Sequence, residues 1–252
     1  MKEAVEFRDL GVMDYKSAWD YQEWLLQENI KVKAVQNSQS KVQKDETHLI
    51  TELSTRNYLL FVEHPPVYTL GKSGKIEHVL ISERERQEKG IEFYQTNRGG
   101  DITFHGPQQI VGYPILDLEK FYTDIGRYLR ELEEVIILTL AEYGIQAGRS
   151  KGETGVWIDA DIKGKERKIC AMGVRCSRWI TMHGFAFNVN TDLDYFNYII
   201  PCGIQNKKVT SLKEELGCEI DMEEVKEKLK QNFEKVFNVV LKETVPGELT
   251  ME

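Results

Sequence analysis

Strand-like segments follow one another without an intervening helix over residues 155–189, and this feature limits the possible folds more than any other. The segments GVWIDA, KICAMGV and ITMHGFAFNV are short and apolar, and stretches rich in charged residues separate them. Strands that come in runs, with helices grouped elsewhere, indicate an α+β fold rather than a strict βαβ alternation. The sequence therefore predicts a mixed or antiparallel sheet flanked by helices. A length of 252 residues fits a single domain that spans residues 1–252.

Three segments outside this run carry the apolar spacing of amphipathic helices. The first starts at Asp14, and the second runs from about Asp124 to Tyr143. The third follows Asp221, a side chain that is well suited to cap a helix N-terminus. Its apolar face consists of Val225, Leu229, Phe233 and Val236.

Two further segments have a local interpretation. The segment YLLFVEHPPVYTLG reads as a buried strand that Pro65 and Pro66 interrupt. The segment around residues 36–55 is polar, and we expect it to form a solvated extension of the domain.

The charge of the chain narrows the classes of partner. The formal net charge is −8, which argues against nucleic acid or an anionic membrane surface as the main partner. No apolar stretch approaches the length of a membrane span, and the N-terminus lacks the pattern of a signal peptide. The sequence therefore predicts a cytoplasmic protein with no nucleic-acid and no membrane partner.

The cysteines and histidines do not have the spacing of a metal site. No CxxC or HxxxH pair occurs, and no histidine lies within four residues of a cysteine. We therefore expect free thiols, no metal and no cofactor. The four cysteines are Cys170, Cys176, Cys202 and Cys218.

Cys202 lies in the bend PCGI. Pro201 fixes its own φ near −65°, and Gly203 allows backbone angles that other residues avoid. A thiol held in this way is either a small buried hydrophobe or a nucleophile presented into a cleft. The local sequence leaves both interpretations open.

Glycines next to charged or imidazole groups mark a second candidate segment, NRGGDITFHGPQQ at 97–109. Gly99 and Gly100 would let the backbone approach a ligand and direct N–H groups at it, and Arg98 would add a positive charge. A plain hairpin turn explains the same residues equally well.

Three segments taken together resemble the lipoyl(octanoyl) transferases, which belong to the biotin/lipoate protein ligase group. They are RGGDITFHGPQQ, KICAMGV and HGFAFNVNTDLDYFNYIIPCGI, and the resemblance covers roughly residues 58–218. It implies a biotin/lipoate-protein-ligase-like fold. One position departs from the pattern, since the family usually has glycine where this chain has Gln108, and a side chain there would alter the backbone of the loop beside His105.

The resemblance also implies a reaction. An octanoyl group would move from octanoyl-acyl carrier protein onto Cys202 as a thioester, and then to a lysine of a lipoyl domain, with Lys168 as the acid and base. Aminolysis of a thioester is favourable, so no ATP is required. The substrate-binding residues that we expect on this basis are Arg98, Gly99, Gly100, Thr103, His105, Tyr113, Ala171, Met172, Gly173, His183, Gly184 and Ala186.

Several of these roles have a structural alternative. His105 and His183 could be satisfied structural histidines, Arg98 could hold loop carbonyls, and Tyr113 could be ordinary strand packing. The backbone N–H groups of Gly99, Gly100 or Gly203 are candidates for the oxyanion hole.

Strand phase and chain length give two more expectations. Alternation along KICAMGV places Lys168, Cys170 and Met172 on one face, which makes Cys170 either a rival nucleophile or a small core residue. Selection of acyl-chain length needs a closed pocket end, which we expect from Ile115, Phe185 and Phe187.

Acidic partners are at first sight incompatible with a net charge of −8. Residues 144–180, however, contain eight basic and four acidic side chains, a local balance of +4 that could attract a carrier protein or a lipoyl domain. A solvated hairpin is the alternative.

Three other functions stay open from the sequence. An ATP-dependent lipoate or biotin ligase also needs the glycine loop and a lysine, but no cysteine nucleophile. A noncatalytic module that binds acyl groups or lipoyl domains would use Cys202 only for packing. A thioester hydrolase would release free octanoate.

Overall fold

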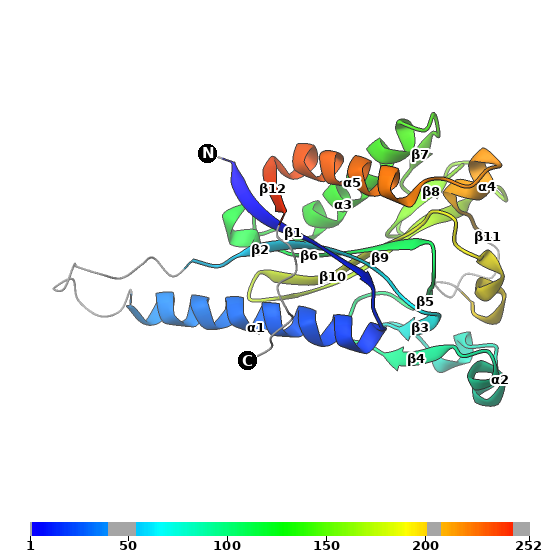
Figure 1. Ribbon diagram of the computed structural model, residues 1–252, viewed down its shortest axis with the longest axis horizontal. Helices are drawn as coiled ribbons and strands as arrows, with labels where there is room; N and C mark the ends of the chain where they lie inside the picture. Colours follow the sequence, from blue (N-terminus) through cyan, green and yellow to red (C-terminus); the bar gives the residue numbers. More distant parts are fainter. Residues whose placement is uncertain (1, 40–53, 201–207, 244–252) are drawn as a thin grey trace.

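The computed structural model describes residues 2–39, 54–200 and 208–243, and a twisted sheet of nine strands organises these residues (Figure 1). Eight strands lie in the order β12-β1-β2-β6-β10-β9-β8-β7, and β11 pairs with β9. Their bounds are β1 Glu3–Val12, β2 Asn57–Glu63, β6 Gln109–Ile115, β7 Ala147–Gly148, β8 Val156–Ile158, β9 Arg167–Ser177, β10 Ile180–Asn188, β11 Lys208–Val209 and β12 Val239–Glu243.

The sheet is mixed. β1 runs parallel to both β12 and β2, and β11 runs parallel to β9. The other pairs, from β2 to β7, are antiparallel. The three strand segments of residues 155–189 become β8, β9 and β10, neighbours in the sheet, as the sequence predicts.

A second sheet of three strands, in the order β4-β3-β5, lies at one end of the first. Its strands are β3 Val67–Leu70, β4 Glu92–Gln95 and β5 Ile102–His105. Pro65 and Pro66 separate β2 from β3, so the two halves of YLLFVEHPPVYTLG join different sheets. The prolines therefore mark a change of sheet, because proline lacks the N–H that a ladder needs.

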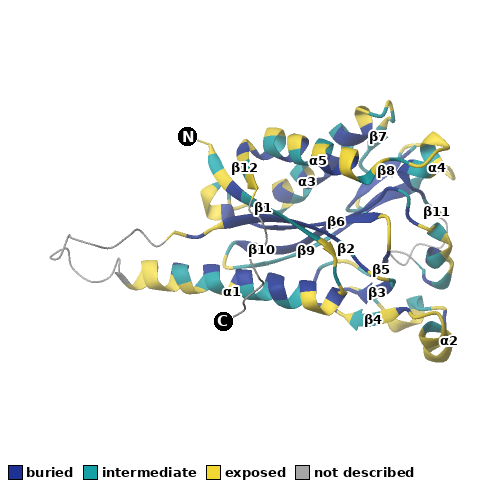
Figure 2. Ribbon diagram, in the orientation of Figure 1, coloured by how far each residue is buried: buried dark blue, intermediate teal, exposed yellow. Residues whose placement is uncertain are grey.

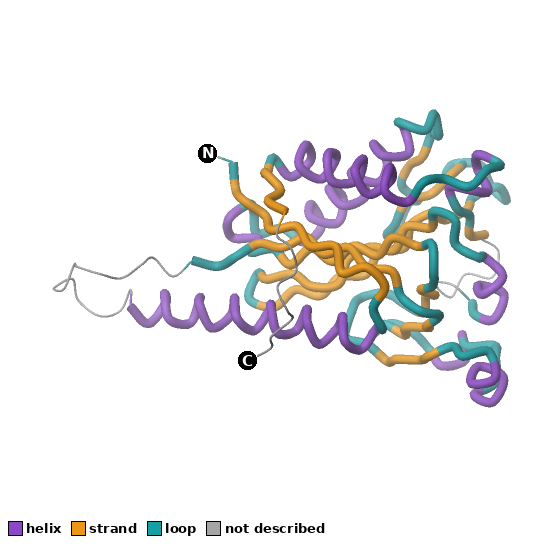
Figure 3. Tube along the Cα trace, in the orientation of Figure 1, coloured by secondary structure: helices purple, strands orange, loops and turns teal. Residues whose placement is uncertain are grey.

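Long helices cover both faces of the large sheet (Figures 1 and 3). α1 (Tyr15–Gln39) packs on one face, and α3 (Ile125–Ala141) and α5 (Met222–Phe237) pack together on the other. The remaining helical elements are short: α2 (Glu83–Glu88), α4 (Leu212–Leu216) and 3-10 turns at Ile76–His78, Leu118–Lys120 and Leu193–Tyr198. Asp124 and Asp221 cap α3 and α5 with their carboxylates, which confirms two predicted helix starts.

Two apolar cores lie on the two faces of the large sheet, and a third includes Tyr68 and Phe104 of the small sheet (Figure 2). Of the first two, the larger lies under α3 and α5 and includes Leu132, Ile136, Leu229 and Phe233. The smaller lies under α1 and includes Tyr21, Leu25 and Leu26. The predicted α+β fold, with a mixed sheet flanked by helices, is confirmed.

Two elements differ from the sequence expectation. α1 continues through Gln39, so residues 36–39 are helical and do not belong to an irregular extension. Residues 40–53 of the expected extension lie outside the described residues, and Thr55 at its end is buried and donates to the Asp117 carboxylate at 2.8 Å. β12 has no counterpart among the predicted strands, and it forms where α5 ends at Asn238, whose left-handed backbone turns the chain back onto β1.

None of the helices within the described ranges combines the length and the apolar character that a bilayer crossing requires.

Candidate active site

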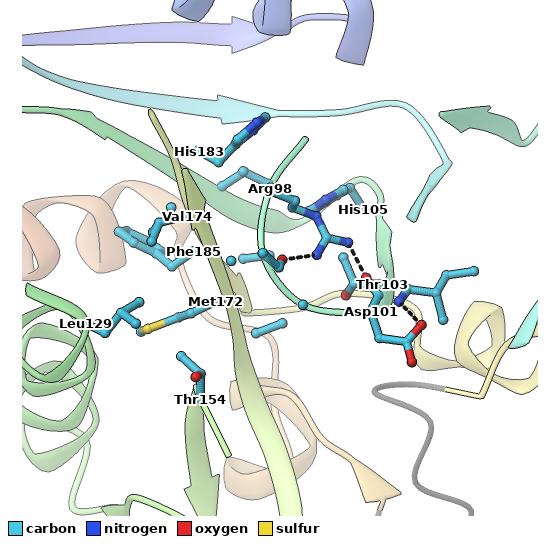
Figure 4. A pocket seen from close by; sticks show the side chains of 18 of the residues that line it. Arg98, Asp101, Thr103, His105, Leu129, Thr154, Met172, Val174, His183 and Phe185 are labelled. Atoms are coloured by element: carbon cyan, nitrogen blue, oxygen red, sulfur yellow. Dashed lines mark hydrogen bonds between the residues drawn. The ribbon is translucent and has the colours of Figure 1, made fainter. Parts of the chain in front are cut away.

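A cavity of about 530 Å³ lies where β9, β10 and the loop 98–103 meet (Figure 4). Lys168 lines it together with all twelve residues that were expected to contact substrate. These are Arg98, Gly99, Gly100, Thr103, His105, Tyr113, Ala171, Met172, Gly173, His183, Gly184 and Ala186. Cys202, the expected nucleophile, lies outside the described residues.

Small residues on two paired strands make room for the cavity. Ala171 and Gly173 on β9 face Ala186 and Gly184 on β10 in the antiparallel register. A Cβ atom on Gly184 would lie 2.1 Å from the carbonyl oxygen of Gly112, and one on Gly173 would lie 2.5 Å from that of Gly99. Glycine is therefore required at both positions for the backbone to pack this closely.

The buried side chain of Arg98 holds the loop 98–103 in place through hydrogen bonds to backbone carbonyl groups. The side chain is buried, and its guanidinium donates to the carbonyl oxygens of Thr69 at 2.6 Å, Asp101 at 2.8 Å and Gly99 at 3.0 Å. These contacts match the alternative in which Arg98 orders the loop. The N–H of Gly99 donates to the carbonyl oxygen of Val174 at 2.9 Å, so it is not directed at a ligand, and the expectation of Gly99 as an oxyanion donor is wrong.

His105 is held by side chains on both ring nitrogens. Its Nδ1 lies 2.9 Å from Oε1 of Gln109, and its Nε2 lies 3.2 Å from the hydroxyl of Thr69. Burial, its largest influence, holds the pKa of His105 well below its usual value. The imidazole is therefore uncharged near neutral pH.

His183 is also buried and uncharged. Its Nε2 contacts Oδ1 of Asn97 at 2.7 Å, and its backbone takes a left-handed φ of 58°. Burial, with a smaller effect of the Arg98 charge, lowers the pKa of His183 to about 3. The two histidines give the cavity polar but neutral walls.

Two tyrosines complete this part of the wall. The hydroxyl of Tyr113 lies 2.8 Å from Nε2 of His64, whose Nδ1 donates to the carbonyl oxygen of Met13. Tyr15, in the first turn of α1, stacks on His105 with ring centroids 5.8 Å apart and also lines the cavity. The sequence predicts only that Tyr15 follows the start of a helix at Asp14, because nothing in its spacing distinguishes a cavity wall from a core.

Lys168 lies at the start of β9 and is 7% exposed. Its Nζ lies 4.6 Å from the ring centroid of Trp157, a cation–π contact with the neighbouring strand. Gly155 lies beside the lysine stem, and a Cβ there would contact Cε of Lys168 normally at 3.5 Å but would clash with the carbonyl oxygen of Cys170 at 2.5 Å.

The strand phase expected for Lys168 needs correction. The register of β8 against β9 shifts between Val156 and Trp157, so Lys168 and Cys170 oppose successive residues of β8. An irregularity of this kind interrupts the period of two. Cys170 and Met172 both belong to the core beneath α3 and α5, and of these two only Met172 also lines the cavity with Lys168.

The described cysteines are poorly placed for nucleophilic chemistry. Burial raises the pKa of the Cys170 thiol well above its usual value and also raises that of Cys176. Cys218 is exposed, and neither it nor Cys176 lines the cavity. The core interpretation of Cys170 agrees with its position.

The expected pocket end is found only in part. Phe185 lines the cavity, but Ile115 and Phe187 are buried in the two cores on opposite faces of the sheet. The residues that the sequence missed are Tyr15, Ser73, Asp101, Ile102, Val111, Ile125, Leu129, Glu153, Thr154 and Val174. Most of them come from loops and helices whose placement depends on tertiary packing.

Gln108 has a left-handed backbone conformation, which glycine adopts without strain. Its φ is 61°, its N–H donates to the Glu63 carboxylate at 2.8 Å, and its carbonyl accepts from the N–H of Asn190 at 3.0 Å.

The fold defines the class of protein. A lipoate-protein ligase A bound with ATP matches with a TM-score of 0.66 at 15% identity, over 99% of this chain and 91% of that one. A bi-partite lipoate protein ligase of Thermoplasma acidophilum matches with a TM-score of 0.68 at 15% identity, over 98% and 89%. The chain therefore has the fold of the lipoate-protein ligases.

Sequence relatives narrow this class to a family. The chain belongs to the lipoyl protein ligase A/B catalytic domain family, whose model matches residues 14–234. It is 58% identical over 243 residues to the octanoyltransferase of Christiangramia forsetii, which covers 96% of this chain and 99% of the relative. The octanoyltransferase of Parabacteroides distasonis is 44% identical over 235 residues, with coverages of 93% and 99%. The resemblance seen in the three sequence segments is confirmed.

Proposed function

We propose that this protein is an acyltransferase that moves an octanoyl group from octanoyl-acyl carrier protein, through a thioester on Cys202, to a lysine of lipoyl domains. Relatives that are 44% to 58% identical and carry the name octanoyltransferase support octanoyl transfer in lipoate biosynthesis. The donor, the thioester and the pairing of Cys202 with Lys168 are the finer parts of the proposal.

One observation carries the proposal: Lys168 and the expected contact residues surround a single cavity in which the two histidines and Tyr15 are uncharged. His105 and His183 are uncharged because burial lowers their pKa values, and burial raises the pKa of Tyr15 to about 12. A cavity of about 530 Å³ with such walls suits an apolar chain. Burying the methylenes of an octanoyl group would contribute on the order of 5 kcal/mol at about 0.8 kcal/mol each.

The chemistry proceeds in two balanced steps. The thiolate of Cys202 attacks the donor thioester, the carbon–sulfur bond to the donor breaks, and the departing thiolate takes a proton from Lys168. The acceptor amine then attacks the new thioester and forms a carbon–nitrogen bond. Cys202 leaves as a thiolate, and Lys168 takes the proton that the amine loses, which restores the starting state.

Lipoyl-domain acceptors are supported by a structural neighbour, which was solved as a lipoate protein ligase with its E2 lipoyl domain. Electrostatic attraction by the basic stretch at 144–180 has less support. Arg149 pairs with Glu133 and Glu134, and Arg167 pairs with Asp159 and Glu215. These arginines are neutralised internally, so we expect only a shallow salt dependence of partner binding.

Octanoylation of a purified lipoyl domain tests the proposal and separates it from its rivals. With octanoyl-acyl carrier protein and no ATP, we expect the lipoyl domain to gain one octanoyl group by mass. Transfer from free octanoate that requires ATP would identify a ligase. Release of free octanoate without octanoylation of the lipoyl domain would identify a hydrolase. Absence of turnover with either donor would indicate a noncatalytic binding module.

A further inference from the structure

The cavity has a lining that differs in burial from part to part. In one part of its lining, which we call the closed arm, Tyr15, His105, Val111, Tyr113 and Ala186 are all buried. In another part, which we call the open arm, Ile125, Leu129, Glu153, Thr154 and Val174 are each partly exposed, and Ser73 and Gly100 form a separate exposed part of the lining beside Arg98. Figure 4 shows Leu129, Met172, Val174 and Phe185 together on one side, and Arg98, Thr103 and His105 on the other.

The two arms lie on opposite faces of the large sheet. Val111, Tyr113 and Ala186 belong to the core under α1, whereas Ile125, Met172 and Val174 pack with the core under α3 and α5. The cavity can reach both faces because β8 pairs with β9 only at Arg167, Lys168 and Cys170. Beyond Cys170, no strand within the described residues pairs with that edge of β9.

The open edge of β9 offers peptide groups to a ligand. The carbonyl of Val174 points away from β10 and accepts the N–H of Gly99. In an antiparallel ladder, alternate residues direct their N–H and C=O groups to the same side, so those of Met172 point the same way. Such an edge readily pairs with an extended chain that carries amides.

We propose that the open arm holds the pantetheine chain of an acyl-thioester donor, while the acyl chain lies in the closed arm. This inference rests on the proposed function and deepens it. The closed arm suits the end of the substrate that terminates in a methyl group. The open arm suits the end of the substrate that continues to a carrier protein. Lys168 is only 7% exposed, so the part of the donor that reaches it from outside must be a slender chain.

The lining of the open arm fits the chemistry of pantetheine, in which amides alternate with short aliphatic stretches. Ile125 and Leu129 provide an aliphatic wall, and the β9 edge at Met172 and the hydroxyl of Thr154 provide partners for the amides. A lysine side chain of the acceptor has an apolar stem without amides, so it would form no hydrogen bonds with the backbone N–H and C=O groups at the edge of β9. We therefore assign the open arm to the donor.

Filling the open arm tests the assignment. Leu129→Trp should obstruct it, and two donors of the same acyl length should report the effect: S-octanoylpantetheine and S-octanoyl-2-mercaptoethanol, which lacks the amide chain. We expect kcat/KM for lipoyl-domain octanoylation to fall about tenfold or more with the first donor and to stay within about twofold with the second. Leu138→Trp, on the same helix and away from the cavity lining, is the matched control and should change neither.

The outcomes distinguish a failure of the arm assignment from a failure of the proposed function. An equal loss with both donors, no loss with either, or a shift in preference toward shorter acyl chains in Leu129→Trp would overturn the assignment of the arms. A wild-type protein that transfers an octanoyl group neither from these donors nor from octanoyl-acyl carrier protein would instead refute the proposed function. Should Leu129→Trp not fold, Leu129→Ala serves, with KM for octanoylpantetheine expected to rise about fivefold and that for the short donor unchanged.

Discussion

Lys168 lies in an enclosed setting, where its Nζ contacts the ring of Trp157 and its side chain lines the cavity. Its proposed role requires it both to give and to take a proton during one turnover. An arginine would keep the positive charge but remains protonated at any relevant pH. The identity of this side chain is therefore more important than its charge.

Lys168→Arg should lose most octanoyl transfer, by about a hundredfold or more, which is the usual scale of a lost acid–base group. The measurement is the steady-state rate of lipoyl-domain octanoylation, with circular dichroism to verify the fold. Lys165→Arg, on the exposed turn before β9, is the control and should retain normal turnover. Near-normal activity of Lys168→Arg would remove Lys168 from the mechanism.

Gly155 gives a second prediction at this scale. Its φ is 116°, and a Cβ there would lie 2.5 Å from the carbonyl oxygen of Cys170. Gly155→Ala should therefore lower the free energy of unfolding by about 2–3 kcal/mol, from backbone strain and this close contact. Gly144→Ala, at φ 72° with no atom within 4 Å of its Cβ, should cost only about 1 kcal/mol. Equal losses in urea titrations of the two variants would contradict the proposed clash.

Among the elements, α1 has a structural role that its sequence only partly indicates. Its N-terminal turn supplies Tyr15 to the closed arm, and its distal half is fastened to the chain after β6. There the Lys33 ammonium lies 2.5 Å from the Asp117 carboxylate and 3.0 Å from the carbonyl oxygen of Arg178. Both ionised side chains are buried, so neither tolerates the loss of its partner.

Lys33→Met should lower the free energy of unfolding by about 3 kcal/mol, because it leaves the Asp117 charge buried beside one partner fewer. Lys31→Met removes an exposed pair with Glu28, in which the lysine is 72% exposed, and should change stability by less than about 0.5 kcal/mol. Thermal unfolding of both variants is the measurement. Adding Asp117→Asn to Lys33→Met should recover part of the lost free energy of unfolding. A double variant that is less stable than Lys33→Met by about a further 3 kcal/mol would contradict this explanation.

The sequence predicted the elements more completely than the site. The strands β8, β9 and β10 and the starts of α3 and α5 were readable because apolar period and capping residues are local signals. The sequence did not predict the irregularity that separates Lys168 from Cys170. It also did not predict that α1 continues through Gln39. Both depend on contacts with other elements, which no local pattern encodes.

For the site, the family resemblance supplied residues that spacing alone could not rank. Arg98, Ala171 and Gly184 were expected to contact substrate because they matched motif positions, and they do line the cavity. Residues outside the motifs, such as Leu129 and Thr154, became visible only once α3 and the turn before β8 were placed beside β9.

At the scale of the whole molecule, several histidines are buried in the uncharged form. Burial lowers the pKa of His64 to about 4 and that of His183 to about 3, against roughly 6.5 in an unfolded chain. The unfolded state therefore binds more protons than the folded state between these values. The contribution of these neutral histidines to the free energy of unfolding is fully present above about pH 6.5, and it is lost as the pH falls toward 4 and below.

Acid should accordingly destabilise the protein over this range, and His64→Gln should reduce the effect. We expect the slope of unfolding free energy against pH between about 4.5 and 5.5 to decrease by about 1.4 kcal/mol per pH unit in the variant. Chemical denaturation at a series of pH values measures this slope. An unchanged slope in His64→Gln would show that His64 is not neutral when the protein is folded.

The central claim is that Cys202 carries the acyl group between donor and acceptor. The most direct measurement is the intact mass of the protein after incubation with octanoyl-acyl carrier protein without ATP or acceptor, followed by peptide mapping. We predict a gain of one octanoyl group on Cys202, its absence in Cys202→Ser, and its release when a lipoyl domain is added. Octanoylation of the lipoyl domain by Cys202→Ser at the normal rate, or an adduct that maps to Cys170, Cys176 or Cys218, would contradict the account.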